Sequence, residues 1–194
     1  MINIKLLKEL THDLSVLYVQ NDISLMEDTS ELLENYFKKV DTEYDGQAGF
    51  DKYIAYEKEN GKPYDLIISD INMPKLNGIA MSKKIRAMNH EQFIVIITAH
   101  NEVEFLSSAL DLGIDGYVTK PIENLKLIKV LYKVAQAITN NKFVESHIQV
   151  VEDLNMQLDI QNKELASKNK ELHNKNQELE KSFRMLIFKN KYNT

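Results

Sequence analysis

The sequence predicts a doubly wound α/β fold with a five-stranded parallel sheet, followed by a long C-terminal coiled-coil helix. Short apolar runs alternate with helical patterns up to about residue 137. After residue 138 there is no glycine or proline, and an apolar residue recurs at every seventh position. We therefore divide the chain into an N-terminal extension (1–13), an α/β domain (14–137) and a C-terminal helix (138–194).

Five strands are predicted from short runs rich in Val, Ile, Leu and Tyr, at residues 16–19, 40–44, 66–69, 93–97 and 116–119. The helical patterns that follow them cover 24–37, 47–59, 79–88, 102–112 and a segment from about residue 123. Parallel strands need right-handed crossover connections, so five such units form one sheet with helices on both faces.

Composition limits the class of protein. The chain has 194 residues, 43% of them hydrophobic, a net charge of −5 and no cysteine, which excludes disulfides and thiolate metal sites. It contains no apolar run of about 20 residues and no signal-peptide pattern, so we expect a soluble, cytoplasmic protein with no membrane partner. Residues 141–194 carry a net charge of +1, which gives no reason to expect nucleic acid as a partner.

The last third of the chain carries a strict heptad repeat, at Val144, Val151, Leu158, Leu165, Leu172, Leu179 and Leu186. With these residues at position d, four consecutive a positions are asparagine: Asn155, Asn162, Asn169 and Asn176. Buried asparagine at a lowers stability but favours a parallel, in-register pair. We predict a parallel homodimer through residues 141–190, with Lys175 facing Glu180 of the other copy. The alternative is a solvated single helix or a disordered polar tail.

Three polar side chains stand where predicted strands end. Asp70 follows 66–69, Thr98 follows 93–97, and Lys120 follows 116–119. Ligands of open α/β sheets bind outside the carboxyl ends of the strands, so these groups are expected to meet there. A carboxylate nucleophile beside an ammonium and a hydroxyl suits a phosphorylated carboxylate. The alternative for Asp70 alone is a capping residue of the loop or of the next helix.

These residues resemble the flavodoxin-like receiver domain of bacterial response regulators in two-component signalling. The resemblance covers roughly residues 14–137 and rests on three segments: Asp70-Ile71-Asn72-Met73-Pro74 with Asn77-Gly78, the pair Thr98-Ala99, and Gly116 to Pro121. It implies a phosphorelay in which Asp70 accepts a phosphoryl group from a histidine kinase or phosphotransfer protein, with Mg²⁺ beside it. Such a receiver is not itself an enzyme.

The resemblance also implies roles for neighbouring residues. Thr98 draws toward the phosphate, and Tyr117 swings inward. Asn72 and His100 flank the path of the hydrolytic water, and Ala99 adjoins Thr98. The state of the domain would pass through the helix from about residue 123 into the coiled coil.

One departure from the family concerns the metal. Receivers usually carry two adjacent acids after the first strand, but here those positions are Gln20 and Asn21, with Asp22 one residue later. The expected Mg²⁺ ligands are then Asp70, Asn72, Asn21 and Gln20, a weak set because amide oxygens carry no charge. Asp22 would compensate only through a one-residue slip of the strand, which also turns its side chains over.

Three other functions would fit parts of this sequence. A degenerate receiver that keeps the fold and acts as a phosphorylation-independent dimerisation scaffold is the main alternative. A phosphohydrolase needs a second acid two residues after the nucleophile, where this chain has Asn72. A DNA-binding zipper needs a basic block ahead of the coil, which is missing. The remaining histidines, at positions 12, 90, 147 and 173, have no metal-binding spacing and are expected on the surface.

Overall fold

The computed structural model describes residues 3–99 and 111–192. Its five parallel strands form one sheet in the order β2-β1-β3-β4-β5. The strands are β1 (Ser15–Val19), β2 (Lys39–Glu43), β3 (Leu66–Asp70), β4 (Phe93–Thr98) and β5 (Gly116–Thr119). Every predicted strand is confirmed to within one residue at each end. The buried apolar runs of β1, β3 and β4 explain this agreement, because strands covered on both faces read as continuous hydrophobic segments.

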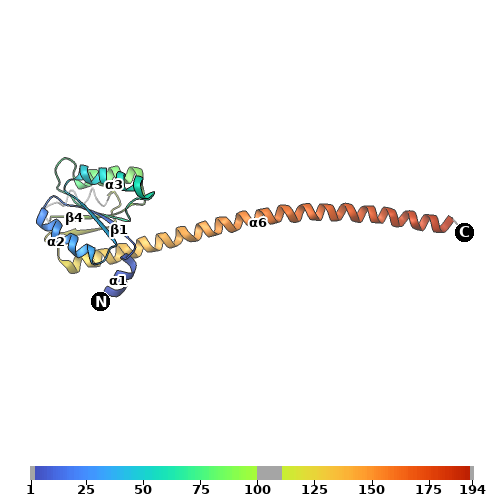
Figure 1. The fold of residues 1–194 in the computed structure, drawn as a ribbon, viewed down its shortest axis with the longest axis horizontal. Coiled ribbons are helices and arrows are strands. Elements are labelled where there is room, and N and C mark those ends of the chain that lie inside the picture. The colour runs from blue at the N-terminus through green and yellow to red at the C-terminus, as the bar shows by residue number, and fades with distance from the viewer. Residues whose placement is uncertain (1–2, 100–110, 193–194) are drawn as a thin grey trace. The chain divides into compact units, whose positions relative to one another are not determined.

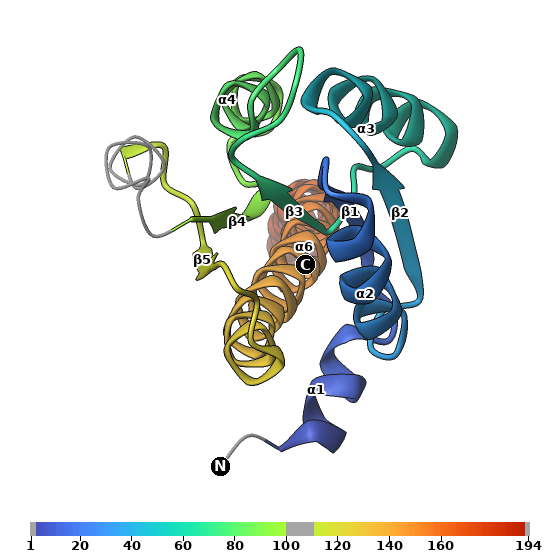
Figure 2. The same ribbon diagram turned by 90° about the vertical axis from the view of Figure 1, so that its left-hand side faces the viewer.

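The helices lie on both faces of the sheet (Figures 1 and 2). They are α1 (Ile4–Thr11), α2 (Ile23–Glu34), α3 (Gly46–Asn60), α4 (Gly78–Met88) and α6 (Asn124–Tyr192). Four of them begin at side-chain caps, where Asn3, Asp22, Asp45 and Asn77 each accept a hydrogen bond from a backbone N–H in the first turn. The helix predicted over 102–112 falls mainly on residues 100–110, which lie outside the described part of the chain.

Two apolar cores hold these layers together, one on each face of the sheet. The first joins α2 and the beginning of α6 to the sheet through Tyr18, Leu33, Ile68, Leu131 and their neighbours. The second joins α3 and α4 to the opposite face through Leu17, Tyr53, Ile67, Met81 and Ile85. Because side chains alternate along a strand, the two cores divide the residues of each strand between them. This division fixes which face each strand-end residue adopts.

Helix α1 lies in the N-terminal extension and was not predicted. Leu7 and Thr11 are fully buried, and the Thr11 hydroxyl donates a hydrogen bond of 2.8 Å to the Tyr36 carbonyl beyond the end of α2. Leu10 packs against the α2/α6 core, and the Lys8 ammonium lies over the Tyr36 ring. The extension is therefore part of the folded unit, although two helical turns are too short to give a clear periodic signal.

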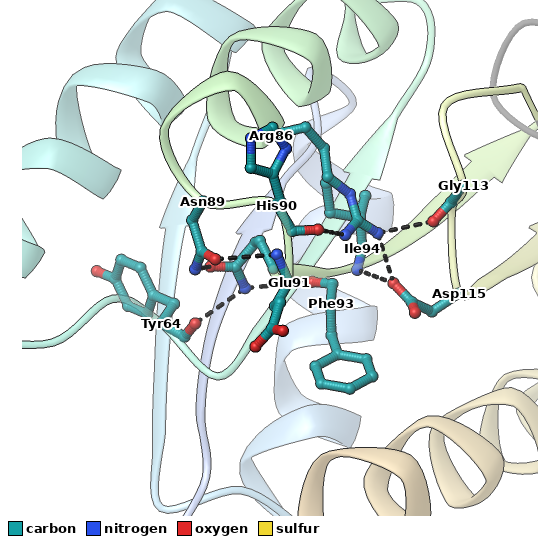
Figure 3. A network of polar contacts seen from close by, with 10 residues as sticks. Tyr64, Arg86, Asn89, His90, Glu91, Phe93, Ile94, Gly113 and Asp115 are labelled. Atoms are coloured by element: carbon teal, nitrogen blue, oxygen red, sulfur yellow. Dashed lines mark hydrogen bonds and ion pairs between the residues drawn. The ribbon is translucent and has the colours of Figure 1, made fainter. Parts of the chain in front are cut away.

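A polar network closes the amino-terminal end of β4 (Figure 3). Gln92 is 2% exposed, and its Nε2 donates to the Tyr64 and Phe93 carbonyls at 2.9 and 3.3 Å. Its Oε1 accepts from the Tyr53 hydroxyl at 3.0 Å. This side chain therefore ties α3 to the segment that enters β3 and to β4 itself.

Arg86 makes a second set of contacts in the same network. Its guanidinium donates to the His90 and Gly113 carbonyls and pairs with the Asp115 carboxylate at 3.2 Å. Asp115 in turn accepts from the Ile94 N–H at 2.8 Å. Arg86 thus connects the end of α4 to the segments that lead into β4 and β5.

The chain divides into two compact units, residues 1–141 and 142–194. In the second unit, residues 142–192 are a single helix, as the absence of helix breakers predicts. From residue 142 to 187 every side chain is exposed, including the heptad positions Val144, Val151, Leu158, Leu165, Leu172, Leu179 and Leu186. The apolar stripe predicted from the sequence is therefore present on a solvent-exposed helix in this single chain.

Candidate functional site

The site lies at the carboxyl ends of β3, β4 and β5. The strand register places Asp70 opposite Ile97 of β4, and Thr98 opposite Thr119 of β5. Lys120 follows directly, and its backbone N–H donates to the Thr98 carbonyl at 2.8 Å. The three residues predicted from the strand ends are therefore held at one edge of the sheet by the backbone ladder itself.

Asp70 is 2% exposed, and its carboxylate contacts both a cation and a backbone donor. Lys120 Nζ lies 2.7 Å from Asp70 Oδ2, and the Ile71 N–H donates to Asp70 Oδ1 at 2.9 Å. A buried carboxylate needs such a cation and such a donor, because an isolated charge is costly to bury. The ion pair joins two residues that are 50 positions apart in the sequence.

The interpretation of Asp70 as a simple helix cap is wrong. Helix α4 is capped by Asn77, whose side chain accepts from the Ala80 N–H at 2.8 Å. Gly78, the first residue of α4, donates its N–H to the Ile71 carbonyl at 2.9 Å. A Cβ atom there would lie 2.0 Å from the Asp70 carbonyl oxygen, so the close approach of α4 to Asp70 requires glycine.

The other predicted residues surround this pair unevenly. Thr98 is 2% exposed, and its hydroxyl donates to the Ala99 carbonyl at 3.2 Å. Asn72 is exposed, and Tyr117 is 45% exposed on the surface of β5. His100 lies outside the described residues.

Alternation along the strands assigns the site to one face of the sheet. Tyr18, Ile68 and Val118 all belong to the α2/α6 core. Gln20, Asp70 and Lys120 each come two residues later on the same three segments. Asp70 ends β3, so its carboxylate shares the α2/α6 face of the sheet with Ile68, and the Lys120 ammonium reaches that carboxylate. Gln20 follows the end of β1, and its side chain affects the pKa of Tyr18 on the same face.

Gln20 occupies the position where receivers usually carry an acid. The register runs without a break from Val16 opposite Leu66 to Val19 opposite Ser69, and Gln20 and Asp70 are the next residues of these two segments. Gln20 is fully buried, and its Oε1 accepts from the Asp22 N–H at 3.1 Å. Within the described part of the chain, its Nε2 has no hydrogen-bond partner.

The side chains of Asn21 and Asp22 do not take the place of the missing acid at position 20. Both side chains are exposed, and the Asp22 carboxylate caps α2 by accepting from the Leu25 N–H at 3.0 Å. The continuous register confirms that β1 does not slip to bring Asp22 to the acid position.

The donor set does not match an acidic magnesium site. Receiver domains generally bind Mg²⁺ for phosphorylation. Mg²⁺ prefers several oxygen ligands that include carboxylates, but Asp70 is the sole carboxylate among the four predicted ligands. At Gln20 the amide oxygen already accepts a hydrogen bond, and the free end of the amide is a donor. Over residues 3–99 and 111–192, no group of three or more His, Cys, Asp or Glu could hold a metal ion.

Two residues near the site, Tyr18 and Lys75, were not predicted to contribute to it. The Tyr18 hydroxyl is buried without a hydrogen-bond partner among the described residues. Burial raises the pKa of Tyr18, the polar side chains of Thr29 and Gln20 oppose that rise, and the charges of Asp70 and Asp22 add to it, so the hydroxyl stays protonated. Its position inside an apolar strand hid it, because tyrosine fits the hydrophobic pattern there.

Lys75 is the second unpredicted residue. Its backbone adopts φ = 62°, and its ammonium lies 2.7 Å from the Asp45 carboxylate, which also caps α3. The loop after Asp70 is thereby fastened to the beginning of α3. The Asp45-Gly46 pair ahead of a helical pattern is an N-cap signal that could have marked half of this contact.

Comparison with known proteins agrees with this geometry. Residues 16–132 match the family described as "Response regulator receiver domain". The chain belongs to this family. The match covers more than half of the chain and spans every strand of the sheet, so the receiver domain of a response regulator in two-component signalling is established as its class.

Relatives and solved structures support the same assignment. The chain is 41% identical over 95 residues to "Response regulator ArlR" of Staphylococcus aureus, a match that covers 49% of this chain and 39% of the relative. It therefore spans well under half the length of this curated relative.

Two solved structures are similar in fold. One is the N-terminal domain of the protein WS1339 from Wolinella succinogenes, with a TM-score of 0.58, 29% identity, and coverage of 68% of this chain and 98% of that one. The other is chemotaxis protein CheY4 of Vibrio cholerae, with a TM-score of 0.55, 28% identity, and coverage of 63% and 98%.

Two further findings concern membrane-spanning helices and the remaining histidines. In the described residues, no helix has the length and apolar character needed to cross a membrane. The histidines at positions 12, 90, 147 and 173 are exposed, as predicted.

Proposed function

We propose that this receiver accepts a phosphoryl group on Asp70 from a histidine kinase or a phosphotransfer protein. The observation that supports this most strongly is the 2.7 Å contact between Lys120 Nζ and the buried Asp70 carboxylate at the carboxyl edge of the sheet. Response regulators interact with such kinases and phosphotransfer proteins. The receiver acts as an acceptor that records a signal and not as an enzyme.

The chemistry follows from the groups in place. A carboxylate oxygen of Asp70 bonds to phosphorus as the bond from phosphorus to the partner's histidine nitrogen breaks. Once the Asp70 carboxylate is phosphorylated, the Lys120 ammonium pairs with the phosphoryl oxygens. Thr98, at the end of β4, donates a hydrogen bond to the same oxygens. Tyr117 and Ala99 then adjust the β4–β5 surface, and Asn72 and His100 set how long the acyl phosphate lasts.

The affinity of this site for Mg²⁺ is expected to be low. Two amides replace two charged ligands, and a pair of unit charges at contact distance is worth about 4 kcal/mol at an effective dielectric constant of about 20, before desolvation. Since Gln20 and Asn21 supply neither charge, phosphoryl transfer that depends on Mg²⁺ is slowed.

Incubation with acetyl phosphate and Mg²⁺ tests the acceptor. The intact protein should gain the mass of one phosphoryl group, and Asp70→Asn should gain none. An equal gain in Asp70→Asn would place the phosphoryl group elsewhere and contradict the proposal.

The second candidate is a receiver that works without phosphate as a dimerisation scaffold. The amide pair at positions 20 and 21, together with the use of Asp22 as a helix cap, favours this candidate. It predicts that beryllofluoride with Mg²⁺ produces no shifts at Asp70, Thr98 and Lys120. It also predicts that the double change Gln20→Glu and Asn21→Asp restores the response.

The C-terminal helix is proposed to form a parallel homodimeric coiled coil through residues 141–190. Each d-position residue from Val144 to Leu186 is more than half exposed in the single chain, and an apolar stripe of this length is unstable in water without a partner. At the start of the stripe, a shallow apolar groove of about 380 Å³ is lined by Phe143, Val144, His147, Ile148, Val151 and Glu152. Side chains of a second copy would fill this groove as knobs.

The charged pair predicted between copies is a minor contribution. Lys175 forms an ion pair with Glu171 within the same helix, so pairing with Glu180 of a second copy has a competitor. Both contacts are exposed and contribute little. The leucines at d and the asparagines at a therefore decide the pairing.

Sedimentation equilibrium tests the coil. Leu165→Asn places a further amide in the seam, at a d position, and should shift the protein toward monomer. Ser167→Asn, in the same heptad but on the outer face, should leave the mass unchanged. Equal behaviour of the two variants would exclude a seam at these leucines.

A further inference from the structure

Beside the acceptor lies a buried hydrogen-bond donor that the fold does not use. Gln20 is fully buried and directly follows Val19, which pairs with Ser69 just before Asp70, and its Nε2 has no partner in the described part of the chain. Buried polar groups are nearly always paired, so an unpaired one calls for an explanation such as a ligand. Gln20 is one of few such groups among the described side chains: Tyr18 Oη, Gln20 Nε2, Ser82 Oγ and Arg86 Nε.

The orientation of this amide is fixed by its other end. The Asp22 N–H donates to Gln20 Oε1 at 3.1 Å, and the reversed amide would set two donors against each other. The unused end of Gln20 is therefore the NH₂ group, which can only donate. A donor in this position attracts an anion and gives no ligand to a cation.

The neighbouring groups have the same preference. Lys120 brings an ammonium to Asp70, and the Ile71 N–H also points at the carboxylate. The Tyr18 hydroxyl, two residues before Gln20, has no partner at hydrogen-bond geometry among the residues described, and the Gln20 side chain lies near enough to lower its pKa. These donors and the ammonium around the acceptor carboxylate can stabilise added negative charge, which the nearby Asp22 carboxylate opposes.

We propose that the Asp70 site binds a phosphoryl-type anion through the Gln20 Nε2 amide and the Lys120 ammonium, without a divalent cation. The amide donor thus takes over part of the charge stabilisation that the acids of other receivers give through their metal. This inference rests on the proposed function of Asp70 as the acceptor. It differs from a weakened magnesium site because it predicts binding in the absence of metal.

The test is ¹⁹F NMR of the full chain with beryllofluoride, whose beryllium coordinates a carboxylate oxygen and whose fluorines replace phosphoryl oxygens. Bound signals are expected with EDTA present, and Mg²⁺ should change the apparent Kd less than about threefold. Gln20→Glu should weaken metal-free binding at least about tenfold, because it replaces the donor by a like charge, and Mg²⁺ should restore the binding.

Two control variants separate the effect of the Gln20 amide donor from the effect of its side-chain volume. Gln20→Met keeps the size and removes the donor, so metal-free binding should fall and Mg²⁺ should not restore it. Gln136→Glu makes the same chemical change on an exposed face of α6 and should leave binding unchanged. If Gln20→Glu does not fold, as judged by circular dichroism, Gln20→Met decides.

The outcomes also separate this inference from the proposal on which it rests. Binding of wild type only with Mg²⁺ would overturn the metal-free site and leave Asp70 as the acceptor. Metal-free binding that is unchanged in Gln20→Met would also overturn the inference. No binding under either condition would overturn the acceptor itself.

Discussion

Two buried glutamines at opposite ends of the sheet are used in different ways. Gln92, at the amino-terminal end of β4, has partners for both its amide nitrogen and its oxygen. Gln20, at the carboxyl end of β1, has a partner for its oxygen and none for its nitrogen in the described part of the chain. Satisfied buried amides specify a structure, whereas an unsatisfied one lowers stability and is retained where a ligand uses it. The comparison therefore assigns Gln92 to the fold and Gln20 to the site.

The sharpest test of this comparison is Gln92→Leu. The change leaves the Tyr64 carbonyl and the Tyr53 hydroxyl without their partner, so the free energy of unfolding should fall by about 2–4 kcal/mol. Urea unfolding followed by circular dichroism measures the loss. A loss that is no larger than that of an exposed substitution such as Gln136→Leu would remove the basis of the comparison.

Arg86→Leu should have the next largest effect, with a loss of about 2 kcal/mol near neutral pH, because two carbonyls and the Asp115 carboxylate lose their donor. Burial raises the pKa of Asp115, and Arg86 counteracts that shift. Without Arg86 the pKa rises further. Since the protonated carboxyl needs no cation, the defect should shrink as the pH falls through that raised pKa.

The measurement is the same urea titration, repeated at neutral and acid pH. Arg86→Lys serves as the matched variant, because it keeps the charge near Asp115 and loses the planar fork that reaches the carbonyls. We expect it to retain a defect with little pH dependence. A defect of Arg86→Leu that grows on acidification would contradict the role given to Asp115.

Gln20→Leu should change stability by less than about 1 kcal/mol, in either direction. It removes an unpaired buried amide nitrogen, which favours folding, and it removes the contact with the Asp22 N–H, which opposes folding. Thermal unfolding beside Gln92→Leu gives the direct contrast. A large loss would mean that the Gln20 nitrogen is paired in solution, and the two glutamines would then be alike.

The smallest expected effect concerns the loop after Asp70. The ammonium of Lys75 and the Ala48 N–H hold the pKa of Asp45 below its ordinary value. This contribution to stability is full above the ordinary pKa of Asp45 and is lost as the pH falls through its lowered pKa in the folded protein. Asp45→Asn keeps the cap of α3 and should flatten this part of the acid dependence of Tm.

Lys75→Gln should flatten the same part of the curve, because it removes the pair from the other side. The double variant should show no more than the single ones. Strict additivity of the two changes would show that Asp45 and Lys75 act independently.

The fold was predictable because its three central strands are buried on both faces. Continuous apolar runs located β1, β3 and β4, and the helical pattern over 47–59 located α3. Helix α1 was missed because two turns give little periodicity. The Arg86 and Gln92 networks were missed because most of their partners are backbone groups of distant segments, which leave no trace in residue spacing.

The candidate site also has some residues that the sequence predicts and some features that it does not. Asp70, Thr98 and Lys120 could be found because they stand at the ends of recognisable strands. The substitution at Gln20 and Asn21 was visible in the sequence, but the direction of the buried amide was not, since it depends on the hydrogen bond from Asp22. The contact of Lys75 with Asp45 joins two loops 30 residues apart and required the structure.

The shared face of Asp70, Gln20 and Lys120 has a consequence for genetics. These residues lie on the side of the sheet that carries Met26 of α2 and Leu127 and Leu131 of α6. Second-site suppressors of changes at the acceptor should therefore concentrate in this layer, where a repacked side chain can reposition the strand ends directly. The opposite layer, with Tyr53 and Met81, is separated from the acceptor side chain by the sheet itself.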